Sequence, residues 1–220
     1  MASPVVNRPR SRRWTGLLVL GVLALVAALA FPLLRESRAR LRARGLPEFG
    51  ALPTFRLTDQ MGRSFSDADL RGAVVVADFI FTRCPTVCPL LTAKMARLQR
   101  QAREAGLSSV RFVSFSVDPR YDTPERLAAY ANTRHLDTSN WSLLTGPLED
   151  VEATVLEGFR VMMGRDADAG DDDFLSIFHG EHFVLVDADG RIRGYYRVLD
   201  DSDGLESLQR DLGALVHAVD

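Results

Sequence analysis

The chain has only two cysteines, Cys84 and Cys88, and both stand in one five-residue stretch. A thiolate is a nucleophile, a redox-active group and a ligand for soft metal ions, so the pair could support dithiol exchange or metal binding. A disulfide used only to staple the fold would close a very small loop, which gives the least stabilisation in the chain-entropy model. The spacing therefore favours a redox-active dithiol or a soft-metal site completed by a third ligand.

The surrounding sequence predicts that both thiols lie at a strand-to-helix turn. An apolar, valine-rich run over 73–81 indicates a buried strand, and a helical face follows at Leu91, Met95, Leu98 and Ala102. A proline follows each cysteine, which keeps both residues out of the middle of a helix. A helix N-terminus lowers the pKa of a nearby thiol, and Arg83 adds a neighbouring cation.

A third ligand could come from one of four histidines. Two thiolates and one imidazole suit Cu(I), although zinc accepts the same donors. His217 falls in a C-terminal amphipathic pattern and His135 at the end of a predicted helix, where each is explained as a surface or structural residue. His179 and His182 are better candidates, because they precede a strand that should neighbour 73–81. The residues alone do not decide between a ligand and a polar loop residue there.

The elements that must position these residues alternate along the chain. Apolar runs over 110–117 and 141–145 predict two more core strands, and Thr123-Pro124 is typical of a helix start. The other expected elements are a short strand over 55–58, a helix from Gly146-Pro147 through about Met163, a solvated loop over 164–173, a hairpin over 183–198 and a closing helix over 205–219. This order predicts an α/β fold with a mixed sheet flanked by helices.

The N-terminal segment predicts a membrane anchor. Residues 14–34 form an uncharged run of 21 residues, long enough for a helix to cross about 30 Å of hydrocarbon. We expect 1–13 to be a basic cytoplasmic tail, 35–47 a juxtamembrane linker and 48–220 a single domain outside the cytoplasmic membrane. Five arginines also follow the run, so charge counting alone does not fix this orientation. A signal peptide cleaved after Ala30 is the alternative, but the run exceeds the usual core of about 7–15 residues.

The charge balance after the first 45 residues argues against a nucleic-acid partner. Residues 46–220 contain 18 basic and 28 acidic side chains, whereas phosphate binding needs a basic face. Asp122 is interpreted as support for the following helix rather than as half of a catalytic pair with Asp118. Five aspartates form an acidic cluster for which we expect a solvated loop: Asp166, Asp168, Asp171, Asp172 and Asp173. The alternative is that this cluster is a docking patch for a basic partner.

Several strings are similar to a known family. The stretch from Phe81 to Pro89 resembles the CPxxCP motif of the Sco/SenC family, and 116–124 resembles its SVDPxxDTP stretch. The strand from Trp141 to Gly146 is also similar, and His179 stands at the family's spacing before Asp187. The resemblance covers roughly 50–217, and the paired motifs are specific together where a lone CxxxC would be weak. Two departures change the field around the thiols without removing a donor: Arg83, where many members have His, and Thr86, where many have Asp.

The resemblance implies a copper-binding, thioredoxin-like domain that is anchored to a membrane and faces the periplasm or the mitochondrial intermembrane space. We expect the first of these locations, the bacterial inner membrane with the domain in the periplasm. The ligands carried over are Cys84, Cys88 and His179, and the two cysteines would also form the redox-active disulfide. The implied function is a copper chaperone that delivers copper to the dinuclear centre of cytochrome c oxidase, with other periplasmic copper chaperones as further partners. The alternatives are a thiol-disulfide reductase that maintains the oxidase cysteines, or a copper or redox sensor.

Proline placement helps to separate metal binding from general dithiol exchange. Thioredoxin-like oxidoreductases usually place a cis-proline before the strand that faces their cysteines, but no proline occurs over 148–220. The corresponding loop instead has Phe178-His179-Gly180, which puts a donor nitrogen in that position. Thr82 stands two residues before Cys84, whereas a peroxiredoxin places its threonine three residues before the nucleophile. The pattern favours a metal site.

Overall fold

The computed structural model describes residues 41–166, 176–199 and 202–219, together with Leu20, Leu25, Leu29 and Ala30. Apart from those four residues, the predicted span over 14–34 lies outside the described residues, as do the basic tail and all of the acidic cluster except Asp166. Within the described residues no helix is both long and apolar enough to cross a bilayer.

One mixed sheet forms the centre of the fold, as the sequence predicts. Its eight strands lie side by side in the order β1 (Gly50–Ala51), β10 (Arg191–Arg197), β9 (His182–Val186), β4 (Val74–Ile80), β5 (Val110–Ser116), β6 (Trp141–Thr145), β2 (Arg56–Asp59) and β3 (Ser64–Ser66). The pairs β4–β5 and β5–β6 are parallel, and β9 runs antiparallel to β4. Every residue of β4 is buried, because this strand has neighbours on both edges and helices cover both faces.

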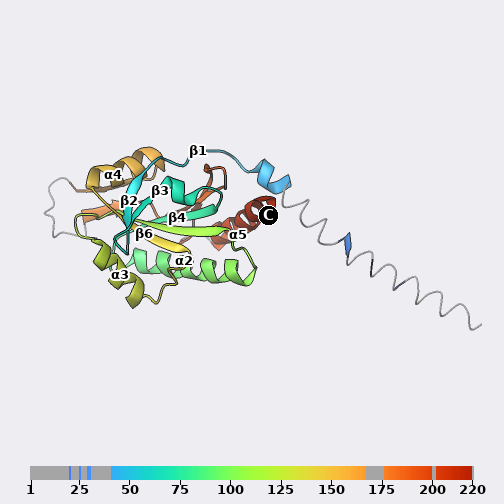
Figure 1. The fold of residues 1–220 in the computed structure, drawn as a ribbon, viewed down its shortest axis with the longest axis horizontal. Helices are drawn as coiled ribbons and strands as arrows, with labels where there is room; N and C mark the ends of the chain where they lie inside the picture. Colours follow the sequence, from blue (N-terminus) through green and yellow to red (C-terminus); the bar gives the residue numbers. More distant parts are fainter. Residues whose placement is uncertain are drawn as a thin grey trace, which may run out of the picture.

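Helices cover the two faces unequally. Figure 1 shows α2 and α3 on one side of the sheet and α4 on the other. The long C-terminal helix lies beside α2, where Gln209 Nε2 donates to Gln101 Oε1 over 2.6 Å. The helical elements are η1 (Asp67–Leu70), α2 (Val87–Glu104), α3 (Pro124–Thr133), α4 (Leu148–Glu152), the π-helical η2 (Ala153–Gly158) and α5 (Ser202–Val219).

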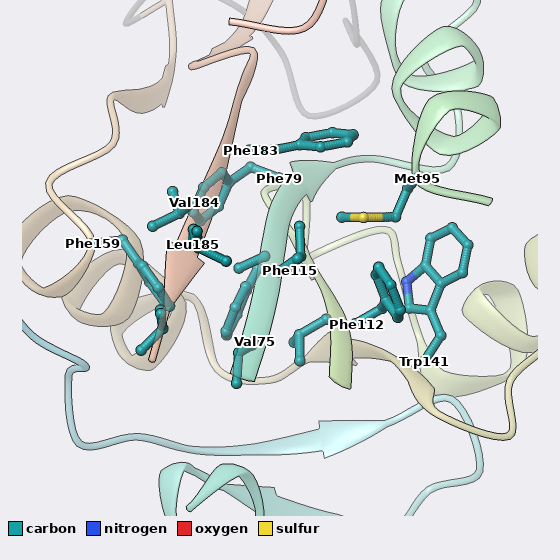
Figure 2. Packing of buried hydrophobic residues seen from close by; sticks show 14 of the residues in the cluster. Val75, Phe79, Met95, Phe112, Phe115, Trp141, Phe159, Phe183, Val184 and Leu185 are labelled. Atoms are coloured by element: carbon teal, nitrogen blue, oxygen red, sulfur yellow. The ribbon is translucent and has the colours of Figure 1, made fainter. Parts of the chain in front are cut away.

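The hydrophobic core divides into two layers around β4 and β5 (Figure 2). On one face the ring of Phe159, at the end of η2, lies 5.6 Å from that of Phe79 and 5.1 Å from that of Phe115. On the other face Phe112 packs against Trp141 at 6.3 Å, with Met95 of α2 above them. The strand that leads to the cysteines is therefore fixed from both sides.

The prediction of one helix through about Met163 is wrong. The helical spacing holds for the fully buried Val151, Val155 and Phe159, but the next buried residues, Val161 and Met163, alternate as in a strand. Arg160 has a φ of 55°, which ends the helix, and β7 (Met163–Arg165) then pairs with β8 (Ile177–His179). The first two residues of the expected 164–173 loop are thus part of a strand.

Candidate metal centre

Both cysteines lie at the turn between β4 and α2, as predicted. Cys84 precedes the helix and Cys88 is its second residue. The backbone N–H of Cys88 points to Cys84 Sγ at 3.5 Å, and that of Phe81 points to Cys88 Sγ at 3.4 Å. Both thiols are buried and free. The backbone at the start of α2 therefore supplies hydrogen-bond donors to the sulfurs.

The two thiols differ in acidity. A hydrogen bond from the Cys88 thiol lowers the pKa of Cys84 to about 4, with help from the backbone N–H groups of Cys88, Thr86 and Val87 and against the effect of burial. The same interaction raises the pKa of Cys88, and burial raises it further. The site at rest therefore holds one thiolate, at Cys84, and one thiol, at Cys88. The predicted lowering of thiol pKa applies to Cys84 alone.

Arg83 does not act as a simple cation beside the thiols. Its Nε donates to Asp118 Oδ2 over 2.7 Å, and its guanidinium lies 4.5 Å from the centre of the Tyr121 ring. The positive charge is therefore shared with a buried carboxylate, and the acidity of Cys84 comes from hydrogen bonds.

His179 reaches the cysteines from a different part of the chain. Its Nε2 lies 3.5 Å from Cys88 Sγ, although the two residues are 91 positions apart. Its Nδ1 lies 3.2 Å from the carbonyl oxygen of Gly180, which can only accept, so Nε2 is left with its lone pair facing the sulfur. Burial lowers the pKa of this histidine, and its ring packs edge-on against Phe81. A neutral imidazole in this orientation can serve as a metal ligand.

The distance between Cys88 and His179 suits a shared ion. A sulfur and a nitrogen bound to one tetrahedral metal at about 2.3 Å and 2.0 Å are about 3.5 Å apart. Across the part of the chain that the structure describes, no group of three or more His, Cys, Asp or Glu side chains is arranged to hold a metal ion as it stands. A centre that uses Cys84 as well therefore needs a side-chain adjustment on binding.

The other histidines are not gathered around the sulfurs. His135 is exposed beyond the end of α3, and His217 lies in the last turn of α5. His182 begins β9 and lines, with His179, a cleft of about 570 Å³. The apolar wall of this cleft includes the exposed Met162 and Phe178. The cleft gives the histidine side of the site an open approach.

Two carboxylates at the end of β5 hold the segment before the cysteines. Asp122 accepts hydrogen bonds from the backbone N–H of Thr82 at 3.1 Å, from its hydroxyl at 2.5 Å, and from Ser116 Oγ at 2.6 Å. The interpretation that Asp122 supports the next helix is therefore wrong, since Thr123 caps that helix instead. No local pattern in the sequence indicates this role, because Thr82 and Asp122 are 40 positions apart.

Comparison with known proteins identifies the family of the chain. Residues 47–212 match the sequence model of a family described as SCO1/SenC. The chain belongs to the SCO1/SenC family. A SCO1/SenC family lipoprotein from Bacillus anthracis is a solved relative, 41% identical, with a TM-score of 0.68 over 76% of this chain and 95% of that one. The resemblance inferred from the sequence is confirmed, and so is the thioredoxin-like fold of the Sco domain.

Two further solved Sco proteins bear on the chemistry. BsSco, described as having a disulfide switch and belonging to the Sco family of cytochrome c oxidase assembly proteins, is 31% identical, with a TM-score of 0.65 over 79% of this chain and 98% of that one. ScoI of Bradyrhizobium japonicum, solved with copper bound, is 26% identical, with a TM-score of 0.59 over 75% of this chain and 99% of that one.

Proposed function

We propose that this Sco chain binds copper through Cys84, Cys88 and His179 and delivers it to the dinuclear copper centre of cytochrome c oxidase during assembly. The observation on which this rests is the 3.5 Å approach of His179 Nε2 to Cys88 Sγ, beside the thiolate of Cys84. Copper bound in a solved Sco relative supports the choice of ion.

The three donors suit a soft ion that must be released again. Cys84 is already a thiolate, the imidazole of His179 is already neutral, and only Cys88 has to lose a proton on binding. Two thiolates and an imidazole are ligands that copper prefers. The cleft beside His179 gives the ligands of a partner a route to the ion, so transfer can proceed by stepwise ligand exchange.

A thiol-disulfide reductase is the second candidate, favoured by the low pKa of Cys84. In this reaction the Cys84 thiolate attacks a partner disulfide and releases one partner thiolate. Cys88 loses its proton and attacks Cys84 Sγ, which frees the second partner thiolate. The partner gains two electrons, one proton from Cys88 and a second proton from the solvent, and the Sco chain is left with a Cys84–Cys88 disulfide. The disulfide switch of BsSco supports this alternative.

A copper or redox sensor, the third candidate, would bind copper without transferring it.

Removal of the imidazole separates the first two functions. We expect His179→Ala to weaken Cu(I) binding and to slow transfer to the copper-binding domain of the oxidase, because one of three ligands is gone. His217→Ala is the matched control, since that residue lies in α5. The full chain in detergent would be titrated with Cu(I) against a competing chelator, and its rate of disulfide reduction measured in parallel. Unchanged Cu(I) affinity and copper transfer in His179→Ala would contradict the chaperone function. A protein that acts only as a reductase would keep its rate of disulfide reduction in this variant.

The proposed location is the inner membrane, with the domain in the periplasm. In this arrangement 1–13 is the cytoplasmic tail, 14–34 the anchor, 35–47 the linker and 48–220 the copper-binding domain. The family match begins at residue 47, and the Bacillus anthracis relative is a lipoprotein, which support a tethered domain. Mass measurement of the mature protein tests the anchor: loss of the first 30 residues would mean a cleaved signal peptide.

A further inference from the structure

His179 lies on a two-stranded hairpin, β7 and β8, that is separate from the main sheet. Strands β7 and β8 have three residues each and form a separate two-stranded sheet. Within it Met163 lies opposite His179, and Arg165 lies opposite Ile177. An isolated two-stranded ribbon is marginally stable in water. Side-chain contacts with the rest of the domain must therefore help to fix the hairpin, and with it the ring of His179.

One buried carboxylate joins this hairpin to the cysteine loop. Asp118 follows β5, and its side chain is only 1% exposed. Its Oδ2 accepts from Arg83 Nε at 2.7 Å, and its Oδ1 accepts from Arg165 Nη2 at 3.1 Å. Arg83 immediately precedes Cys84, and Arg165 is two residues after the partner of His179. Asp118 thus contacts both segments that supply the candidate ligands.

The geometry of Asp118 is itself fixed. Its backbone N–H donates to Ser116 Oγ at 3.2 Å, and that hydroxyl donates to Asp122, which holds Thr82. The side chains of Arg83 and Arg165 are 15% and 20% exposed, so solvent screens these ion pairs less than surface pairs. Charge-assisted hydrogen bonds of this kind are directional as well as strong.

We infer that Asp118 is a positioning residue that keeps His179 within ligand distance of Cys88 by clamping Arg83 and Arg165 together. The inference rests on the proposed copper site and adds a residue to its support. Asp118 acts through the arginines, because each of its oxygens is engaged by one of them. Groups hydrogen-bonded directly to a metal ligand typically change metal affinity about 10- to 100-fold when they are replaced, and Asp118, which acts through the arginines, is expected near the lower end of that range.

A double-mutant cycle tests this role in the full chain in detergent, titrated with Cu(I) against a competing chelator. We expect Asp118→Asn to weaken Cu(I) binding by about 10-fold or more. In the His179→Ala background the same substitution should have little further effect, because its influence passes through the histidine. Arg193→Gln is the matched control: it breaks a comparably buried ion pair, at 2.9 Å from Asp187, outside the site.

The Arg165 variants keep the test informative if Asp118→Asn fails to fold. Arg165→Gln should reproduce the loss of affinity, and Arg165→Lys should restore much of it by keeping the charge. Equal losses from Asp118→Asn with and without the histidine would overturn the inference, as would full affinity in both Asp118→Asn and Arg165→Gln. If His179→Ala alone left affinity unchanged, the proposed copper site would fail first, and the clamp with it.

Discussion

The candidate ligands stand on two supports of different kinds. The cysteines lie between β4 and α2, where Phe79, Ile80 and Cys88 are at most 1% exposed and both faces of the sheet are covered. His179 lies on the two-stranded ribbon of β7 and β8, which is separate from the main sheet. The first support is a strand and a helix packed in the core, whereas the second is a short ribbon that combines the buried Met163 with a few polar contacts.

This difference suggests that the cysteines and the histidine have different roles in copper binding. A packed core keeps the backbone of the thiol pair in place, so that only a side-chain adjustment is needed when an ion binds. A histidine on a short two-stranded ribbon can move with less cost, because that ribbon is not part of the main sheet. We therefore expect the cysteine side to set whether copper binds at all, and the hairpin side to set how tightly it is held and how readily it leaves.

The largest effect on Cu(I) affinity is expected from a substitution at the cysteines themselves. Cys88→Ser removes the sulfur that faces both His179 and the Phe81 N–H, and a hydroxyl is a poor ligand for a soft ion. Cu(I) affinity should fall by more than the roughly 100-fold limit for outer partners, and disulfide formation should be lost. Competition titration and thiol counting measure both. Retention of Cu(I) affinity within 100-fold of the wild type would contradict the assigned role of Cys88.

A second large effect concerns the packed layer beneath the cysteines. Asp78 of β4 is fully buried, and burial raises its pKa to about 7 despite a 2.5 Å hydrogen bond from Ser114 Oγ. Its Oδ2 has no hydrogen-bond partner among the described residues. Asp78 therefore binds more protons in the folded state than in the unfolded state between about pH 4 and pH 7. Its own contribution to stability is greatest below this window and falls as the pH rises through it, by on the order of a few kcal/mol, while the low pKa of Cys84 acts in the opposite direction.

Replacement of this carboxyl by an amide should remove that dependence. Asp78→Asn resembles the protonated acid, so its free energy of unfolding should rise relative to that of the wild type between pH 5 and pH 8. Denaturant unfolding at the two pH values measures the slopes. Parallel slopes in variant and wild type would show that Asp78 is not the titrating group. Glu149→Gln, a change in the first turn of α4 on the opposite face, is the matched control for replacing one carboxyl by an amide.

The same contrast between packing and polar contacts explains which parts could be predicted from the sequence. Strand β6 has the expected bounds, 141–145, and α3 begins at the expected Thr123-Pro124, because hydrophobic period and capping are local signals. The turn that holds both thiols was also predicted, since the prolines restrict it. These features depend on residues within one or two helical turns of each other.

The histidine side could not be worked out in the same way. Three-residue strands are too short to show a period, so the sequence predicts a helix and then a loop where β7 lies. Only the family resemblance distinguishes His179 from His182 as the candidate ligand. The clamp joins Asp118 to Arg83 and Arg165, which are 35 and 47 positions away, and no local pattern encodes such a contact.

The smallest expected effect disturbs the hairpin by packing alone. A Cβ on Gly180 would lie 2.7 Å from Val161 Cγ1, which is buried, and 3.4 Å from His182 Nδ1. Gly180→Ala should therefore shift the residue next to His179 and cost about 1–3 kcal/mol of stability, as overpacking does. Cu(I) affinity should fall less than in Cys88→Ser, while the acidity of Cys84, measured by its alkylation rate against pH, should stay the same.

Gly213→Ala in α5 is the matched control: a Cβ there meets nothing within 4 Å, and loss of a helix glycine should stabilise the fold by about 0.5–1 kcal/mol. A change in Cys84 acidity in Gly180→Ala would mean that the two supports are not independent, and the division between them would have to be abandoned.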